Sequence, residues 1–177
     1  AESDGLPGFI VDRYNDTLVV QCLTAGADHW REVFIPLLVE LTGAAAVYER
    51  SDVDVRRLEG LPERAGALYG TVTDGPLLVQ ENGLNFWVDI VAGHKTGFYL
   101  DQRRNRQRLR ELISGRSLLN CFSYSGGFSV YALAGGAADV LSVDSSADAL
   151  ALGQRNVEAN DLAGERAEWL EEDVFHT

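Results

Sequence analysis

The chain has 177 residues, a formal net charge of −12 at pH 7 and 46% hydrophobic residues. This length suits one or two domains, and the hydrophobic share excludes a chain that is disordered throughout. The acidic balance excludes a polybasic protein whose main task is to neutralise phosphates. Two cysteines are too few for a disulfide framework or a zinc site, and the histidines show no metal-ligand spacing. No apolar run reaches the roughly 20 residues of a membrane span and no secretory signal opens the chain, so we expect a cytoplasmic protein.

The first part of the chain, residues 1–74, predicts a small α+β domain. Ser51, three residues before Asp54, predicts the cap of a short helix that runs through Leu58. Apolar residues at three- and four-residue spacings predict a longer helix with one apolar face, kinked at Pro36. This longer helix is expected over residues 27–41. Strands are expected at residues 9–14, 17–23 and 45–49.

The second part, residues 75–177, predicts a β-hairpin followed by alternating helices and strands. Asn82 and Gly83 lie between two apolar runs, which is a strong hairpin signal because both residues tolerate a positive φ. The elements expected after the hairpin are helices over 100–113, 127–134 and 147–160 and strands at 117–121, 139–143 and 167–170. This alternation indicates βαβ units and a parallel sheet, so the fold class is α/β.

Two features of the second part favour a nucleoside site. A loop from Asn120 to Ser129 follows a predicted strand and opens a predicted helix, where glycines let a ligand approach unpaired N–H groups. Asp144 ends the next strand, 18 residues after Gly126, and an acid at this place can bind ribose hydroxyls. Taken singly, the loop is also explained as a tight turn and Asp144 as a helix cap. Asp173 follows the third strand, where an acid could meet an adenine amino group.

A fourth motif, the run from His94 to Arg103, completes a resemblance to a known family. With the loop and residues 142–146, it resembles the class I S-adenosylmethionine-dependent methyltransferases of the large-subunit ribosomal RNA cytosine-5 type. Motifs that match the same family in the first part lie at residues 4–8, 11–14, 48–52 and 59–61. The resemblance covers nearly the whole chain.

The resemblance implies a protein of three parts: a PUA RNA-binding domain, a central α+β domain and a Rossmann-like methyltransferase. We expect this chain to lack the first part and to stop after the third strand of the sheet, because it contains no methionine and no closing element. It would then hold the central domain followed by the N-terminal half of the Rossmann-like sheet. The strand that begins at Ser117 would be central in the intact sheet. We therefore expect the chain either to self-associate through its open edge, with a homodimer as one outcome, or to occur only as the ordered part of a longer polypeptide.

The resemblance also implies S-adenosylmethionine as the cofactor. It places the 95–103 segment across the cofactor, the 120–126 loop around the methionine moiety, Asp144 on the ribose and Asp173 on the adenine. The residues expected to contact the cofactor are Thr96, Phe98, Gln102, Asn120, Phe122, Ser123, Tyr124, Gly126, Asp144 and Asp173. No catalytic residue is expected in this chain, because the cysteine that attacks C6 of the cytosine belongs to a later motif of the family. We interpret Cys22 and Cys121 as small buried hydrophobic residues.

A basic segment interrupts the acidic chain, since residues 95–116 carry a net charge of +5. Within it, Arg103, Arg106 and Arg110 follow helical spacing, which indicates either a stripe that contacts RNA phosphates or a solvated helix face. The resemblance implies that the function is methylation of RNA, at cytosine C5 of the large ribosomal subunit, and we expect the isolated chain to be inactive. The alternatives are S-adenosylmethionine-dependent methylation of another base or substrate, and a non-catalytic module for RNA binding or dimerisation.

Overall fold

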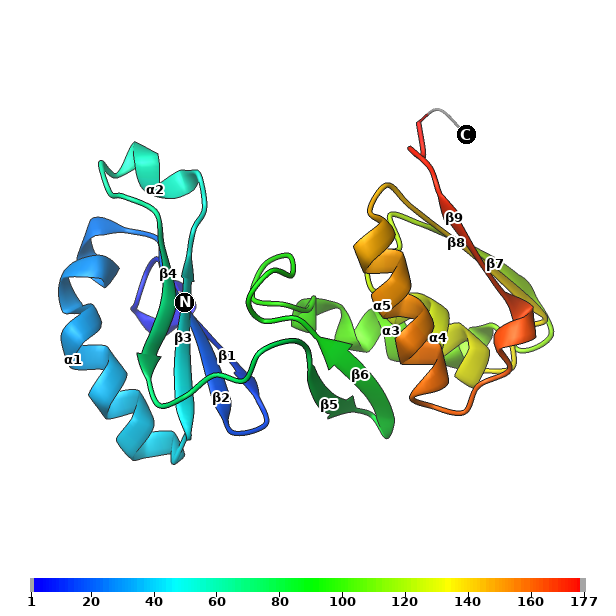
Figure 1. The fold of residues 1–177 in the computed structure, drawn as a ribbon, viewed down its shortest axis with the longest axis horizontal. Coiled ribbons are helices and arrows are strands. Elements are labelled where there is room, and N and C mark those ends of the chain that lie inside the picture. The colour runs from blue at the N-terminus through cyan, green and yellow to red at the C-terminus, as the bar shows by residue number, and fades with distance from the viewer. Residues whose placement is uncertain (1, 176–177) are drawn as a thin grey trace. The chain divides into compact units, whose positions relative to one another are not determined.

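The computed structural model describes residues 2–175 and divides into two compact units (Figure 1). Unit 1 comprises Ala1–Leu77 and Val88–Phe98, and unit 2 comprises Leu78–Trp87 and Tyr99–Thr177. The sequence-based boundary at residue 75 differs from this division, because it assigned residues 75–77 and the segment 88–98 to the second domain. This segment is tied into unit 1 by its backbone and side chains: Arg50, for example, donates a 3.1 Å hydrogen bond to the carbonyl of Ile90. No helix within residues 2–175 combines the length and the hydropathy needed to cross a membrane.

Unit 1 is a four-stranded sheet with helix α1 packed against it. Its elements are β1 (Phe9–Tyr14), β2 (Thr17–Cys22), α1 (Ala25–Thr42), β3 (Ala46–Ser51), α2 (Val55–Leu58) and β4 (Arg64–Tyr69), after a short 3₁₀ turn at Glu2–Asp4. The strand order is β1-β2-β3-β4, with β2 and β3 parallel and the two outer pairs antiparallel. All six residues of β2 are buried, so this strand forms the centre of the core. The predicted α+β architecture of the first part is confirmed.

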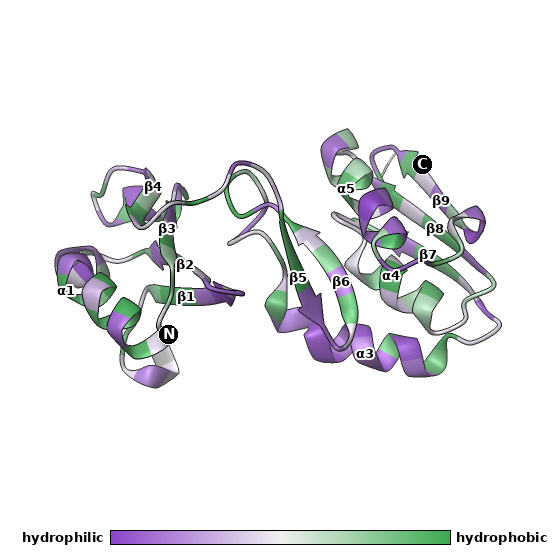
Figure 2. Cartoon of the chain, turned by 60° about the horizontal axis from the view of Figure 1, so that its bottom comes forward, coloured by the Kyte–Doolittle hydropathy of each residue, from purple (hydrophilic) through white to green (hydrophobic). Residues whose placement is uncertain are grey.

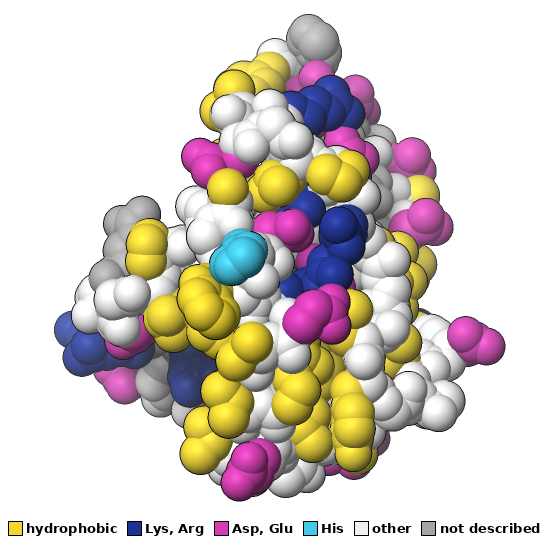
Figure 3. All heavy atoms as spheres, turned by 90° about the vertical axis from the view of Figure 1, so that its left-hand side faces the viewer, with side chains coloured by type: hydrophobic (Ala, Val, Ile, Leu, Met, Phe, Trp, Pro, Cys, Tyr) yellow, Lys and Arg dark blue, Asp and Glu magenta, His cyan; other side chains and the backbone are white. Residues whose placement is uncertain are grey.

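Helix α1 begins and ends at residues suited to those positions. The Thr24 side chain caps the N-terminus by accepting from the Ala27 N–H, and Gly43 ends the helix in the left-handed region at φ 64°. Ala27 and Ile35 are buried against the sheet. The apolar face is wider than the core needs, because a second row of large hydrophobic residues remains exposed: Trp30, Val33, Leu37 and Leu41. Hydrophobic side chains accordingly gather on this side of the molecule (Figure 3).

Two details of unit 1 differ from the sequence prediction. Ser51 does not cap α2: it is the last residue of β3, and its buried hydroxyl accepts a 2.9 Å hydrogen bond from the backbone N–H of Cys22. Asp54 occupies the N-cap position of α2 without a side-chain capping bond. Strand β4 was not predicted, because its sequence lacks an apolar alternation and most of its residues are exposed at the edge of the sheet.

Unit 2 combines a hairpin with a three-stranded parallel sheet. Its elements are β5 (Leu77–Glu81), β6 (Leu84–Val88), a 3₁₀ turn at Leu100–Gln102, α3 (Arg103–Leu112), β7 (Ser117–Cys121), α4 (Gly127–Ala134), β8 (Asp139–Asp144), α5 (Ala147–Glu158), a 3₁₀ turn at Gly164–Arg166 and β9 (Ala167–Glu171). The strand order β7-β8-β9 and the parallel pairing confirm the predicted βαβ units. The hairpin turn is also confirmed, since Asn82 and Gly83 both have positive φ, 50° and 79°.

The parallel sheet has two unlike faces. Helices α4 and α5 pack on one face, where the Trp169 ring lies against Gly153 of α5. On the other face Leu119 is 61% exposed. Within the described residues β7 pairs on one side only, with β8. Association through this edge, and hence a homodimer, stays a prediction.

Helix α3 is hydrophilic over most of its length (Figure 2), as its five arginines require.

Candidate functional site

Asp144 joins the ends of two neighbouring strands. Because β7 and β8 are parallel, their carboxyl ends lie at the same edge of the sheet. There the Asp144 carboxylate accepts a 2.7 Å hydrogen bond from the backbone N–H of Tyr124, in the loop after β7, and a 3.0 Å bond from the N–H of Ser146. The cap of α5 is Ser146, whose side chain accepts from the Ala149 N–H, so the helix-cap explanation of Asp144 is wrong. A carboxylate has about four acceptor positions, and two remain for a ligand.

The loop after β7 has an unusual backbone. Phe122, Tyr124 and Gly126 all have positive φ, at 54°, 48° and 69°. Non-glycine residues in this region are strained and concentrate at functional sites. Between them, the Ser123 N–H donates to the Val143 carbonyl at 3.0 Å, and the Gly126 N–H donates to the Ser123 carbonyl at 2.9 Å. The loop is therefore held in one conformation by bonds to β8 and within itself.

Gly126 is also required by packing. A Cβ atom at this position would lie 2.6 Å from the Trp169 ring, and a Cβ at Gly153 would lie 2.4 Å from it. The turn explanation thus accounts for Gly126 through its positive φ and its close approach to β9. It does not account for the Ser123 hydroxyl, which is buried and has no hydrogen-bond partner among the described residues. A buried hydroxyl without a partner is costly, so it indicates an interaction with a ligand or water.

Asn120 and Phe122 lie in different surroundings. The Asn120 amide donates to the Ser129 hydroxyl at 2.8 Å, on the face of the sheet that α4 covers. Phe122 is 60% exposed, and its ring centroid lies 5.6 Å from that of Phe175. Asp173 is exposed after β9, and its carboxylate accepts a 3.0 Å bond from the Phe175 N–H. Phe175, which was not predicted as a site residue, therefore lies beside Phe122 and Asp173 after β9.

The motif from residue 95 to residue 103 is shared between the units. Thr96 belongs to unit 1 and is 1% exposed; its hydroxyl donates to the Asp12 carboxylate at 2.6 Å and lies 3.0 Å from the Tyr14 hydroxyl. The structure therefore gives Thr96 polar partners inside unit 1, and its contact with the cofactor stays a prediction. Phe98 is buried in the same unit. Gln102, in unit 2, is half-buried, and its amide group bonds Asp101 and Asn105.

The expected arginine stripe is interrupted at its centre. Arg106 is 2% exposed and bound to the carboxylate of Glu81, so it cannot reach a phosphate from this position. Arg103 has a side chain 55% exposed and also bonds Glu81, while Arg110 is half-buried. A shallow depression of about 470 Å³ on this surface has a basic lining with one acid: Asn82, Arg103, Arg104, Gln107, Arg108 and Glu111. Of the three arginines predicted to contact RNA, Arg106 is therefore a buried structural residue, and its prediction as a phosphate contact is wrong.

The two cysteines have opposite environments. Cys22 is buried as predicted, and burial raises the pKa of its thiol to about 11. Cys121 is exposed, so its interpretation as a buried residue is wrong. It lies on the face of β7 opposite the helices, together with Leu119. Within residues 2–175 no group of histidines, cysteines and acids could hold a metal ion.

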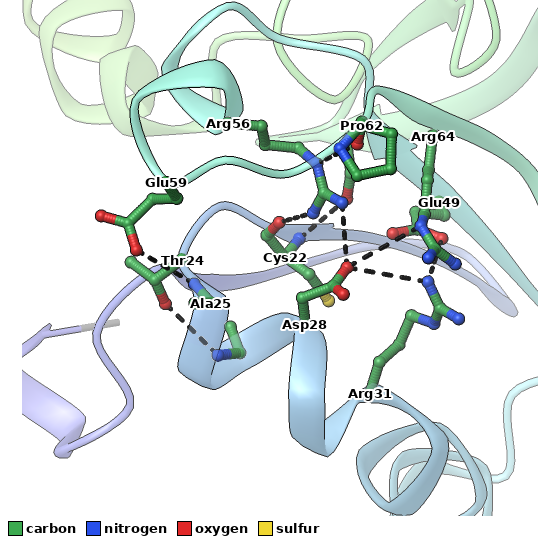
Figure 4. Close-up of polar contacts among 12 residues, drawn as sticks. Cys22, Thr24, Ala25, Asp28, Arg31, Glu49, Arg56, Glu59, Pro62 and Arg64 are labelled. Carbon is green, nitrogen blue, oxygen red and sulfur yellow. Dashed lines mark hydrogen bonds and ion pairs between the residues drawn. The ribbon is translucent and has the colours of Figure 1, made fainter.

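Unit 1 contains a separate cluster of buried charges (Figure 4). Arg56 is fully buried and donates to the carbonyl oxygens of Cys22 and Pro62 and, at 2.9 Å, to the Asp28 carboxylate. Figure 4 shows Arg31 pointing to the same carboxylate and to Glu49, at 3.8 and 3.5 Å. These bonds connect α1, β2, β3 and the segment after α2. The cluster therefore stabilises the fold of unit 1.

The sequence of this chain matches that of known proteins. Residues 55–177 match a family described as S-adenosylmethionine-dependent methyltransferase. Over 175 residues the chain is 50% identical to the ribosomal RNA large subunit methyltransferase I of Aeromonas salmonicida and 49% identical to that of Shewanella amazonensis. In both cases 99% of the chain and 44% of the relative are covered, so the chain spans less than half the length of these relatives.

Solved structures agree in fold. A methyltransferase from Streptococcus mutans superposes with a TM-score of 0.83 at 29% identity, covering 96% of this chain and 43% of the other. A methyltransferase complexed with S-adenosylhomocysteine gives the same values. Methanocaldococcus jannaschii Trm5, solved in complex with adenosine, has a TM-score of 0.75 at 21% identity, covering 99% of this chain and 51% of the other. This last likeness is one of fold alone.

Proposed function

Because the chain belongs to the S-adenosylmethionine-dependent methyltransferase family, we propose that it binds the cofactor at the carboxyl ends of β7, β8 and β9 and serves the methylation of large-subunit ribosomal RNA. The observation that carries this proposal is the hydrogen bond from the Tyr124 N–H to the Asp144 carboxylate. It joins the loop after β7 to the acid that ends β8, which is the position where doubly wound sheets bind nucleosides.

The residues at this edge suit the cofactor. Asp144 keeps acceptor positions for two ribose hydroxyls, and Asp173 is exposed after β9, where it can accept from the adenine amino group. The strained 122–126 loop, with the unpartnered Ser123 hydroxyl, suits the methionine part. Asn120, Phe122, Gly126 and Gln102 complete the proposed site within unit 2. When bound, S-adenosylmethionine supplies an electrophilic methyl group on its sulfonium, and the task of these residues is to bind and orient it.

The RNA target is supported by the relatives, which are named as large-subunit ribosomal RNA methyltransferases. We propose cytosine C5 as the methylated atom on the resemblance of the motifs, with the attacking cysteine supplied by a part of the protein outside this chain. Arg103 and Arg104, two of the exposed arginines of the basic surface, would contact RNA phosphates together with half-buried Arg110. The chain alone would then bind cofactor without transferring a methyl group.

Calorimetry with S-adenosylhomocysteine tests the cofactor proposal. Asp144→Ala should weaken binding by about 1.5–3 kcal/mol, roughly 10- to 100-fold, as expected for hydrogen bonds to a charged group. Asp148→Ala is a matched control, because Asp148 is an exposed acid in the first turn of α5. Equal affinity of the Asp144 variant and the unsubstituted chain would contradict the ribose assignment.

Analysis of ribosomal RNA tests the target. Cells without the whole protein should lack one 5-methylcytidine of the large-subunit RNA, detected by mass spectrometry of nuclease fragments. Loss of a different methylated nucleoside would replace cytosine C5 by that base, and an unchanged RNA would remove ribosomal RNA as the target.

A further inference from the structure

Asn156 of α5 bridges the hairpin and the loop after β7. It is 0% exposed. Its Oδ1 accepts a 2.6 Å hydrogen bond from the Trp87 N–H of β6, and its Nδ2 donates a 2.9 Å bond to the carbonyl of Ser125. An N–H requires an acceptor and a carbonyl requires a donor, so only this orientation of the amide satisfies both neighbours. We propose that Asn156 is a positioning residue for the cofactor. It sets the orientation of the Ser125–Gly126 peptide and thereby the affinity of the loop for the amino-acid group of the cofactor. This inference rests on the function proposed above.

The Ser125–Gly126 peptide enters the N-cap residue of α4, which is Gly126. Its N–H, on Gly126, donates to the Ser123 carbonyl at 2.9 Å, and its carbonyl is held by Asn156. Both ends of the peptide are therefore fixed, and its plane cannot rotate without breaking a buried hydrogen bond. Gly126 is the N-cap and Gly127 begins α4, so this plane, through the backbone of Gly126, orients the first free N–H groups of the helix. Those groups attract a carboxylate, such as the one in the methionine part of the cofactor.

Asn160 provides an internal comparison, because it lies one helical turn beyond Asn156. Its side chain accepts from the Asn85 N–H at 2.7 Å and donates at 2.7 Å both to the Asn85 carbonyl and to the backbone carbonyl of Asn156. Both asparagines thus anchor the same region to β6, and both are at least half-buried. Asn156 alone of the two bonds the loop. A purely structural role would make the two positions equivalent, whereas a positioning role distinguishes them.

The test compares Asn156→Asp with Asn160→Asp, which change the same atom. Each aspartate keeps the acceptor for its β6 N–H and loses the amide donor, and at position 156 the new carboxylate oxygen faces the Ser125 carbonyl. Two probes separate the ends of the cofactor: S-adenosylhomocysteine, and 5′-methylthioadenosine, which has the nucleoside and the sulfur but lacks the amino-acid group. Calorimetry measures both dissociation constants, and thermal unfolding measures the stability of each variant.

Asn156→Asp should raise the dissociation constant for S-adenosylhomocysteine about tenfold, the effect of one lost hydrogen bond, and leave that for 5′-methylthioadenosine within about twofold. Asn160→Asp should change neither beyond about twofold at a similar loss of thermal stability. Equal weakening of both probes by Asn156→Asp, or weakening of neither, overturns the proposal. If the unsubstituted chain binds neither probe, the proposed function itself fails.

Hydrogen exchange of the unsubstituted chain keeps the proposal testable if the variant at 156 does not fold. The Gly126 amide should exchange slowly before any cofactor is added, because its peptide is already fixed. Rapid exchange of this amide, at the rate of an unprotected residue, overturns the proposal irrespective of the variants.

Discussion

The carboxylate of Glu81 binds the guanidinium of Arg106 through two hydrogen bonds of 2.9 Å, and the side chains are only 5% and 2% exposed. The pair joins the end of β5 to α3. It also receives a 3.0 Å bond from the Tyr131 hydroxyl of α4 to Glu81, and Arg106 donates to the Tyr99 carbonyl at 2.9 Å. These bonds connect β5, α3, α4 and the segment before α3, so the buried ion pair holds unit 2 together.

Removing one partner of this pair should unfold unit 2 more easily. Arg106→Met leaves the Glu81 charge buried with less compensation, and we expect a loss of about 3–5 kcal/mol in the free energy of unfolding. Arg103→Met is the matched control: it bonds the same carboxylate but its side chain is 55% exposed, so the loss should be at most about 1 kcal/mol. Urea unfolding followed by tryptophan fluorescence measures both. Similar losses for the two variants would show that the burial of Arg106 does not add to the free energy of unfolding.

The close packing of Trp169 gives a second prediction. Gly153→Ala places a methyl group 2.4 Å from the indole ring and should destabilise the chain by about 1–3 kcal/mol, and the additional change Trp169→Leu should recover part of that loss. Gly26→Ala is the control, since Gly26 lies in α1 with open space at its Cβ, and we expect it to be stabilising by about 0.4–1 kcal/mol. Thermal unfolding checks all three variants; a neutral Gly153→Ala would contradict the packing argument.

The cysteines should differ in reactivity. At pH 8 a thiol reagent should modify exposed Cys121 rapidly and leave Cys22 unmodified until the chain is unfolded in urea, because Cys22 is buried with a pKa raised to about 11. Two equally fast reactions would mean that unit 1 opens readily.

The raised pKa of the Cys22 thiol makes the free energy of unfolding depend on pH in the alkaline range. Between the ordinary pKa of 9.0 and the folded pKa of about 11, the unfolded chain releases the Cys22 proton and the folded chain retains it. The stabilisation is thus complete below pH 9 and is lost as the pH rises to about 11. Cys22→Ala should flatten this part of the profile. Tyr131, whose pKa burial raises to about 12, should retain a decline above pH 10 in that variant.

RNA binding by the whole protein should depend on the exposed arginines of α3. The double change Arg103→Ala and Arg104→Ala should make the slope of log K against log salt shallower by about one unit per lost phosphate contact. Arg57→Ala serves as control, because Arg57 is exposed in unit 1 and paired with Glu63 at 2.7 Å. An unchanged slope in the double variant would assign these arginines to a solvated helix face.

Local sequence patterns were sufficient for most elements of this fold. The Asn82-Gly83 turn, the alternation of strands and helices after residue 100 and the position of Asp144 at a strand end depend on turn chemistry and hydrophobic periodicity, which neighbouring residues determine. Strand β4 escaped detection because an exposed edge strand needs no apolar alternation. It forms through hydrogen bonds to β3, a partner that its own residues do not specify.

The sequence alone therefore determined the fold class, the strand-end acid and the loop that follows β7. Only the tertiary structure decided which charged and polar side chains are free to act. Arg106 has the spacing of a surface arginine but lies buried on Glu81, 25 residues away, and Thr96 bonds Asp12, 84 residues away. Asn156 reaches Trp87 and Ser125 in the same manner. The physical reason is that periodicity shows which side of an element a residue occupies, whereas burial and hydrogen-bond partners depend on which distant segment packs against that side.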